Sequence, residues 1–184
     1  DQSQGLTAKD VLYTYDRASL IRILRAYADE KFAPRIVDNI IEARENNALS
    51  TTKELADLVK ESIPAAARRT GGNPAKRTFQ ALRIEVNHEL EVLERAIPAA
   101  MAALNIGGRI VVMSYQSLED KIVKSFFTTA CTSTTPRNLP VELPNSAAKF
   151  SYVITGSEKA SDAEVESNPR AQSVRIRAIE RVAA

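Results

Sequence analysis

A long helical pattern followed by a glycine pair and a β-branched run constrains this chain most. Residues 76–104 carry apolar side chains at helical spacing, and Gly107-Gly108 end that pattern. Ile110-Val111-Val112 then form a continuous apolar run, which predicts a central strand covered on both faces. The polar residues Tyr115-Gln116-Ser117 lead into a second helix at 118–127. The order predicts one βα unit of an α/β sheet, a fold that binds ligands where its parallel strands end.

Helical patterns dominate the first half of the chain. Residues 7–41 predict two or three short amphipathic helices, with Thr7 as the first N-cap. Residues 51–54 have the form of a capping box, in which the Thr51 hydroxyl and the Glu54 carboxylate accept from free backbone N–H groups. Pro64 is expected to end that helix.

The remaining patterns predict a boundary and two late strands. Residues 64–74 break the helical spacing, so we predict a helical domain at 1–72 and a second domain at 73–184. Pro98 marks a kink or break in the long helix, and residues 128–148 predict a long loop. The remaining two segments alternate apolar and polar residues and predict antiparallel strands. They are 150–155 and 174–179.

Composition sets limits on the function. The chain has 184 residues, of which 44% are hydrophobic, enough to bury a core. Its 25 basic and 23 acidic residues nearly cancel, so any RNA site must be a local patch. One cysteine, Cys131, allows no internal disulfide and no Cys-rich zinc site, which favours a cytoplasmic protein without a metal. No segment has the length and apolarity of a membrane span, and residues 1–5 do not resemble a signal peptide, so we expect a soluble protein without a membrane partner.

The first candidate site lies after the central strand. It consists of Ser114, Tyr115, Gln116 and Ser117. These residues would contact a substrate or cofactor, because strand ends of α/β sheets hold ligands. The alternative is that the segment only caps the following helix, with Ser117 as its N-cap.

Basic residues beside the predicted domain boundary form a second candidate site. They are Arg68, Arg69, Lys76 and Arg77. They would hold RNA phosphates, unless they are ordinary solvated charges. Asn168-Pro169-Arg170 is either a tight turn into the last strand or, through Asn168 and Arg170, a further RNA contact.

Three other features favour no chemistry. Residues 71–78 lack the glycine before lysine and the preceding strand of a phosphate-binding loop. His88 is expected to be an exposed residue within a helix. Cys131 lies in a Thr-rich segment without the motif of a cytosine-C5 methyltransferase nucleophile.

The predicted elements are too few for a complete doubly wound sheet. Three strands make less than half of such a sheet, and the strand at Ile110 would keep one edge unpaired. The chain begins with Asp and contains no Gly-rich cofactor turn after an early strand. We therefore expect missing strands upstream.

Three motifs resemble the bacterial small-subunit ribosomal RNA cytosine-N4 methyltransferases, which use S-adenosylmethionine. Residues 73–87 resemble the helix by which that family re-enters its catalytic domain after a helical insertion. Residues 114–120 resemble its Ser-Phe-His-Ser-Leu-Glu-Asp signature, and 168–170 with 175–182 resemble its terminal motif. The resemblance implies a partial class I, Rossmann-like methyltransferase sheet plus an inserted helical domain. It also implies that the cofactor motif lies in an upstream half.

The chain departs from that family at two positions. Asn73 and Gln116 stand where the family has histidines. Neither side chain takes up a proton near neutral pH, so no histidine general base is carried over. Methyl transfer to an exocyclic amine is an in-line displacement that mainly needs positioning, which Tyr115 and Gln116 would still provide.

The resemblance therefore predicts a fragment of an enzyme that methylates a flipped or exposed cytidine in small-subunit ribosomal RNA. The inserted helices would dock the RNA, and the partners would be that RNA and the upstream half, with a homodimer as a further assembly. We expect this chain alone to bind S-adenosylmethionine weakly or not at all. The alternatives are a non-catalytic helical module that binds RNA or protein, and a nucleotide-binding half domain, which no phosphate motif supports.

Overall fold

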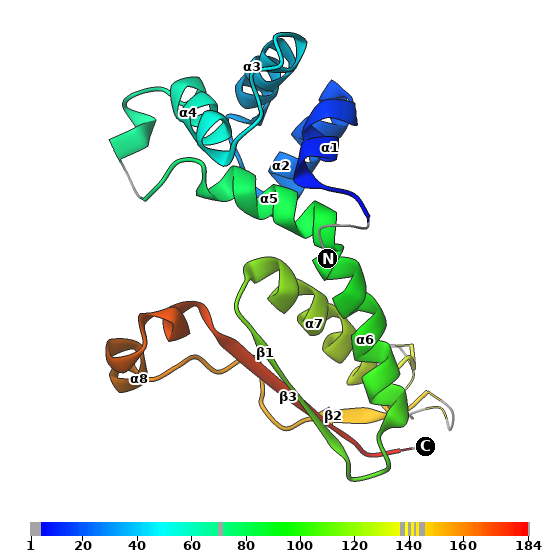
Figure 1. Cartoon of the computed structure of the whole chain (residues 1–184). Helices are drawn as coiled ribbons and strands as arrows, with labels where there is room; N and C mark the ends of the chain where they lie inside the picture. The colour runs from blue at the N-terminus through cyan, green and yellow to red at the C-terminus, as the bar shows by residue number, and fades with distance from the viewer. Residues whose placement is uncertain are drawn as a thin grey trace. The chain divides into compact units, whose positions relative to one another are not determined.

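The computed structural model describes residues 5–69, 72–136, 139, 141, 143 and 146–183, except for the side chain of Arg69. The chain forms two compact units, Asp1–Glu89 and Leu90–Ala184 (Figure 1). Among the described residues, no helix is both long enough and apolar enough to cross a bilayer.

The first unit is helical, as the sequence predicts. Its elements are α1 (Ala8–Thr14), α2 (Arg17–Ala28), α3 (Ala33–Glu45), α4 (Thr52–Ser62), the 3-10 turn η1 (Ala67–Arg69) and α5 (Lys76–Asn87). Their apolar faces meet in one core, which includes Val11, Leu20, Ile23, Ile36, Val37, Ile40, Leu55, Val59 and Leu82. The two or three helices predicted within 7–41 are therefore three.

Side-chain caps start two of these helices where predicted. Thr7 caps α1 and forms a capping box with Asp10. At α4, Glu54 Oε2 accepts from Thr51 N at 2.8 Å and from Ser50 N at 2.7 Å. These backbone donors hold the pKa of the Glu54 carboxyl below its usual value. Helix α4 ends at Ser62, two residues before Pro64, as expected.

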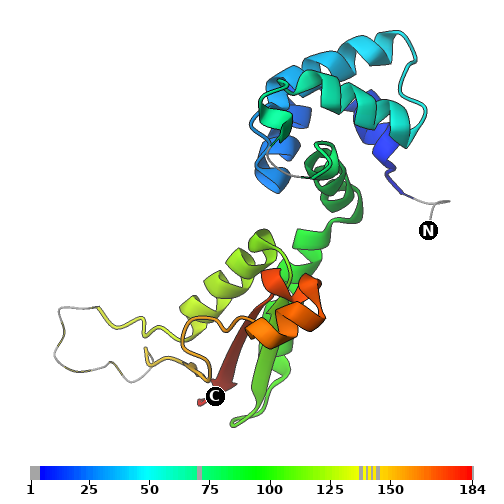
Figure 2. The same ribbon diagram turned by 90° about the vertical axis from the view of Figure 1, so that its left-hand side faces the viewer.

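The second unit places helices on a three-stranded sheet. Its elements are α6 (Glu89–Ala103), β1 (Arg109–Ser114), α7 (Ser117–Ala130), β2 (Phe150–Tyr152), α8 (Asp162–Ser167), the 3-10 turn η2 (Pro169–Ser173) and β3 (Arg175–Arg181). The strand order is β1-β3-β2, and both pairs are antiparallel. Helix α7 lies along the sheet (Figures 1 and 2). The core between them includes Ile97, Val123, Phe127, Phe150 and Ile179.

One predicted helix is in fact two. The break in 76–104 lies at His88, which takes a left-handed φ of 51° and ends α5, whereas Pro98 lies inside α6. His88 is exposed as expected but caps a helix end. Because α5 packs against α1 and α2, the compact units divide after Glu89 and not at 72/73. That residues 73–89 belong to the methyltransferase portion of the family stays a prediction.

The position of β1 in the sheet also differs from the prediction. Among the described strands, β1 lies at an edge of the sheet, because β3 lies between β1 and β2. Strand β1 pairs with β3 in the antiparallel direction, whereas the prediction was a parallel sheet. Val111 is 63% exposed and Met113 is 53% exposed, whereas Ile110 and Val112 pack into the core. The expectation of cover on both faces is therefore wrong. Within the described residues, the far edge of β1 is unpaired, as expected.

The second core gives a direct test. The Phe127 side chain is 1% exposed, so Phe127→Ala should lower the free energy of unfolding of the second unit by about 3–5 kcal/mol. Chemical denaturation followed by circular dichroism measures this change. Ile106 is 64% exposed in the same unit, and Ile106→Ala should change stability by no more than about 0.5 kcal/mol. Equal losses for both variants would contradict the described core.

Candidate functional site

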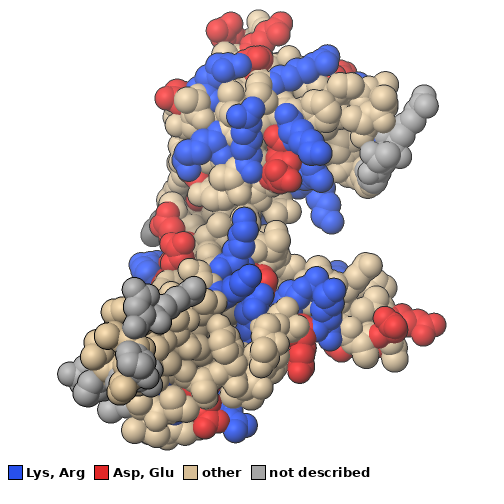
Figure 3. Space-filling view, turned by 180° about the vertical axis from the view of Figure 1, so that it is seen from behind, with Lys and Arg blue, Asp and Glu red and all other residues tan. Residues whose placement is uncertain are grey.

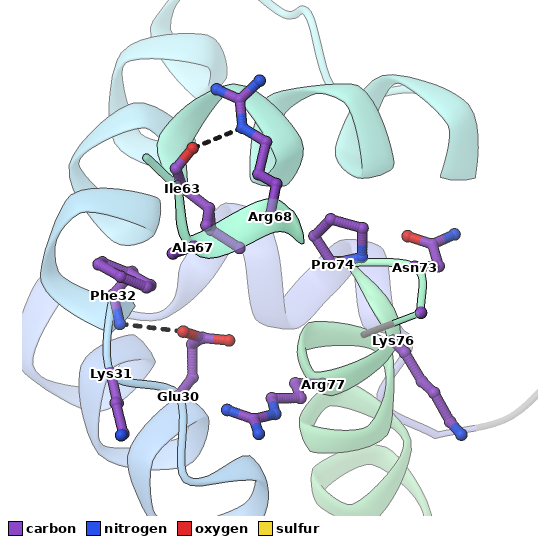
Figure 4. Close-up of a pocket in the computed structure, with 11 residues that line it drawn as sticks. Glu30, Lys31, Phe32, Ile63, Ala67, Arg68, Asn73, Pro74, Lys76 and Arg77 are labelled. Atoms are coloured by element: carbon purple, nitrogen blue, oxygen red, sulfur yellow. Dashed lines mark hydrogen bonds between the residues drawn. The ribbon is translucent and has the colours of Figure 1, made fainter. Parts of the chain in front are cut away.

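A pocket of about 590 Å³ lies in the first unit, where three segments meet. Its lining residues are Glu30, Lys31, Phe32, Ile63, Ala67, Arg68, Gly72, Asn73, Pro74, Lys76 and Arg77 (Figure 4). The α2–α3 loop forms one wall, the end of α4 with η1 a second, and the start of α5 a third. Its volume lies within the range of small-ligand sites, which is about 300–1,000 Å³.

Backbone turns fix the first wall of the pocket. Asp29 takes a left-handed φ of 48° and ends α2, and Glu30 N donates to Leu24 O at 3.1 Å. The Glu30 residue is only 3% exposed, and its Oε1 accepts from Phe32 N at 2.9 Å. Phe32, the N-cap residue of α3, is half-buried and packs partly against the helical core.

The third wall begins at Asn73, one of the two positions that depart from the family motif. Asn73 Oδ1 accepts from Ala75 N at 2.9 Å, and Asn73 O accepts from Lys76 N at 3.0 Å. The amide oxygen thus shapes the turn that starts α5. Because Asn73 Oδ1 accepts this hydrogen bond, Asn73 has a structural role at the rim of the pocket.

The structure gathers three of the four basic candidates at this pocket, but uses them differently. Arg68 Nε donates to Ile63 O at 2.6 Å and so caps the end of α4. With described residues, Arg77 makes one long hydrogen bond, 3.4 Å from its Nη1 to Asp29 O. The side chains of Lys76 and Lys31 make no hydrogen bond or ion pair with a described residue. The side chain of Arg69 lies outside the described residues.

Hydrogen bonds to a side chain of α7 hold the predicted strand-end site, residues 114–117, in place. Ser114 ends β1 and is 3% exposed, while Tyr115 is 52% exposed. The N-cap residue of α7 is Gln116, so Ser117 is the first helical residue and not the N-cap predicted for it. Glu119 Oε2 accepts from Tyr115 N at 2.9 Å and from Gln116 N at 3.1 Å, which holds this loop in place.

An ion pair ties the start of α7, directly after this loop, to the central strand β3. Asp120 Oδ1 and Oδ2 accept from Arg177 Nε and Nη2 at 2.7 and 2.9 Å. Arg177 also donates to Gly156 O at 2.7 Å, so it joins α7, β3 and the segment after β2. The Arg177 hydrogen bonds hold the pKa of the Asp120 carboxyl below its usual value, against the opposing effect of burial.

The third group of candidates forms a turn. Asn168 Oδ1 accepts from Arg170 N at 3.2 Å and caps η2, which leads directly into β3. Arg175, the first residue of β3, is paired with Ser114 in the sheet register. Asn168 therefore has the turn-forming role that was one of its two readings, whereas the side chain of Arg170 makes no hydrogen bond or ion pair with the described residues. Cys131 ends α7, and burial raises the pKa of its thiol, which disfavours a nucleophilic thiolate.

Sequence reasoning missed Glu30, Lys31, Phe32 and Arg177. Nothing local in the sequence distinguishes Glu30 from a solvated acid, because its burial arises from the contact of three distant segments. Arg177 had a weak signal, an arginine alternating with apolar residues in a predicted strand. On the face shown in Figure 3, Lys and Arg side chains lie near one another on both units with Asp and Glu among them. Charge alone therefore does not locate a site.

Comparison with known proteins gives a consistent result. The model of a family described as "MraW methylase family" matches residues 1–182. A Corynebacterium glutamicum protein named "Ribosomal RNA small subunit methyltransferase H" is 54% identical over 183 residues, covering 100% of this chain and 54% of that protein. Proteins of the same name from Corynebacterium diphtheriae and Mycolicibacterium smegmatis are 58% identical over 180 residues and 57% identical over 182 residues. These alignments cover 98% and 99% of this chain, and 53% and 49% of the relatives.

The helical unit and the mixed helix-and-strand unit are thus those of a methyltransferase-type α/β protein. More particularly, the chain belongs to the MraW methylase family. It spans about half the length of the curated relatives it matches.

The ion pair at the strand-end loop makes a pH-dependent prediction. Asp120→Asn should lower the free energy of unfolding of the second unit by about 2 kcal/mol at pH 7, because Arg177 stays largely buried without its partner. The folded-state pKa of Asp120 is depressed, so its stabilisation is present above the unfolded pKa of about 3.9 and is lost as pH falls through the folded pKa. Denaturation curves of both proteins should therefore converge below about pH 4.

The control for this experiment is Glu166→Gln, which removes an exposed carboxylate from α8 in the same unit. It should change stability little at either pH. A difference between wild type and Asp120→Asn that stays constant from pH 7 to pH 3 would contradict the assigned role of the carboxylate.

Proposed function

We propose that this chain belongs to a cytoplasmic enzyme that uses S-adenosylmethionine to methylate the exocyclic N4 of a cytidine in small-subunit ribosomal RNA. The observation that carries the proposal is the family match over residues 1–182, together with the names of the relatives. The motif resemblance at 114–120 supports the same reaction.

The exposed side of the sheet supports a larger catalytic domain. Strand β1 has an unpaired edge within the described residues and bears Val111 and Met113 in exposed positions. Upstream strands would pair with that edge, and the helices that connect them would cover these side chains, completing a class I, Rossmann-like sheet. The first unit would then be the inserted domain. The principal cofactor motif would lie in the upstream half.

The strand-end loop would act by positioning. S-adenosylmethionine supplies, when bound, a methyl group on a sulfonium that an amine attacks in line. The exposed Tyr115 and the half-buried Gln116 lie at the carboxyl end of β1, where they would orient the base or the cofactor. Glu119 and Asp120 would keep them there through the contacts described above. Gln116 would hydrogen-bond without exchanging a proton.

The first unit would dock the RNA. Lys31 and Lys76 lie at the pocket without carboxylate partners among the described residues, and their ammonium groups suit phosphate contacts. The alternative function is a non-catalytic RNA-binding module, favoured by the first unit having its own core and its own pocket. Cofactor binding distinguishes the two functions.

Calorimetric titration with S-adenosylmethionine tests the catalytic proposal. The 184-residue chain should bind weakly or not at all, whereas a longer form carrying the additional length of the relatives should bind in the micromolar range. The longer form should also convert cytidine to N4-methylcytidine in small-subunit RNA, detected by mass spectrometry of nucleosides. Micromolar binding of S-adenosylmethionine by the 184-residue chain would contradict the proposal that the cofactor motif lies upstream.

If the 184-residue chain formed a homodimer through the edge of β1, its mass in solution would be twice that of the monomer.

Lys76→Gln tests the docking role. Loss of one phosphate contact should weaken binding of single-stranded RNA to the same extent for all sequences and reduce the slope of log K against log salt by about 0.7. Fluorescence anisotropy at several salt concentrations measures both effects. The matched control is Lys53→Gln, an exposed lysine of α4 away from the pocket. Identical slopes for the two variants would refute a phosphate contact at Lys76.

A further inference from the structure

The pocket of the first unit contains a buried carboxylate that the phosphate-docking role leaves unexplained. Glu30 is 97% buried, and within the described part of the chain its carboxylate has one hydrogen bond, from Phe32 N to Oε1. Among the described residues, Oε2 accepts no hydrogen bond and joins no ion pair. Glu30 lines the pocket, so Oε2 keeps an acceptor capacity that no described residue uses.

Glu30 and Arg77 face each other across the pocket. In Figure 4 the Glu30 carboxylate and the Arg77 guanidinium point toward one another, with Lys31 and Lys76 farther out on either side. Arg77 and Glu30 form no ion pair, and among the described residues the guanidinium makes one hydrogen bond, the 3.4 Å contact with Asp29 O. The pocket thus presents an acceptor and a donor that do not pair with each other.

The rest of the pocket lining is largely apolar. It includes Phe32, Ile63, Ala67 and Pro74, and Ile63 is 5% exposed. Flat apolar ligands suit such a wall, and an aromatic ring such as Phe32 can stack on the face of a nucleic-acid base. An unpaired nucleotide has the three required features, namely a flat base, hydrogen-bonding groups on its edge and a phosphate for the outer lysines.

We propose that this pocket binds one unpaired RNA nucleotide and that Glu30 selects bases with an exocyclic amine over uracil. This inference rests on the proposed RNA function and adds a base-reading residue to it. Glu30 Oε2 accepts from the exocyclic amine, as carboxylates do from cytosine N4, and Arg77 donates to the neighbouring ring nitrogen. The N–H of uracil lies between two carbonyl oxygens, which a carboxylate repels.

Binding of the 184-residue chain to labelled six-nucleotide oligo(C) and oligo(U) tests the inference by fluorescence anisotropy. Wild type should bind oligo(C) about tenfold more tightly than oligo(U), as one specific base contact provides. Glu30→Gln should remove most of that preference by weakening oligo(C) binding. The substitution removes a buried charge and keeps an oxygen for Phe32 N, and circular dichroism checks that the variant is folded.

The control is Glu45→Gln, which removes an exposed charge of α3 outside the pocket and should keep the preference. Equal wild-type affinities for oligo(C) and oligo(U), or equal effects of Glu30→Gln on both, would overturn base reading and indicate phosphate binding alone. The preference of the wild-type chain for oligo(C) over oligo(U) is measured without any variant. The proposal can therefore be refuted even if the Glu30→Gln protein does not fold. If the longer form methylates RNA while this chain shows no base preference, the inference fails and the proposed function stands. If the longer form does not methylate RNA, the proposed function itself fails.

Discussion

Two separate hydrophobic cores are the constraint on which the rest of this chain depends. A single run of helix-forming residues supplies both cores, and the left-handed residue His88 divides it. Helix α5 contributes Leu82 to the helical core, and α6 contributes Ile97 to the core beneath the sheet. Each candidate site is built on one of these cores. The pocket lies at the meeting of helix ends in the first, and the strand-end loop lies on the sheet of the second.

In both sites, charged side chains hold the local structure in place by hydrogen bonds. Part of the family motif therefore has a structural role. In the segment 114–120, Glu119 holds two backbone N–H groups and Asp120 holds Arg177. The acidic end of the motif is therefore explained by local architecture, whereas the exposed Tyr115 is not. Arg68 at the pocket likewise serves the end of α4. From residue type alone, Glu119, Asp120 and Arg68 could each have been interpreted as ligand-binding residues.

Local signals predicted most of the fold, and long-range packing decided the rest. Capping residues such as Thr51, and alternation in the last strands, act within a few residues and were recognisable in the sequence. The edge position of β1 depends on β3, which lies more than sixty residues later, so a continuous apolar run was misinterpreted as a central strand. Arg68, Lys76 and Arg77 were predicted as candidates from their charge, and the structure places them at the pocket. Glu30 was not predicted as a site residue, because its burial depends on tertiary contacts that no local sequence pattern reveals.

The open edge of β1 has a consequence for the chain as a physical object. Exposed N–H and C=O groups beside Val111 and Met113 form a template on which another extended segment can add. Natural sheets protect such edges with charges, prolines or bulges, yet the middle of this strand carries only Ile110, Val111, Val112 and Met113. Handled by itself, the chain is thus exposed to concentration-dependent aggregation through one strand.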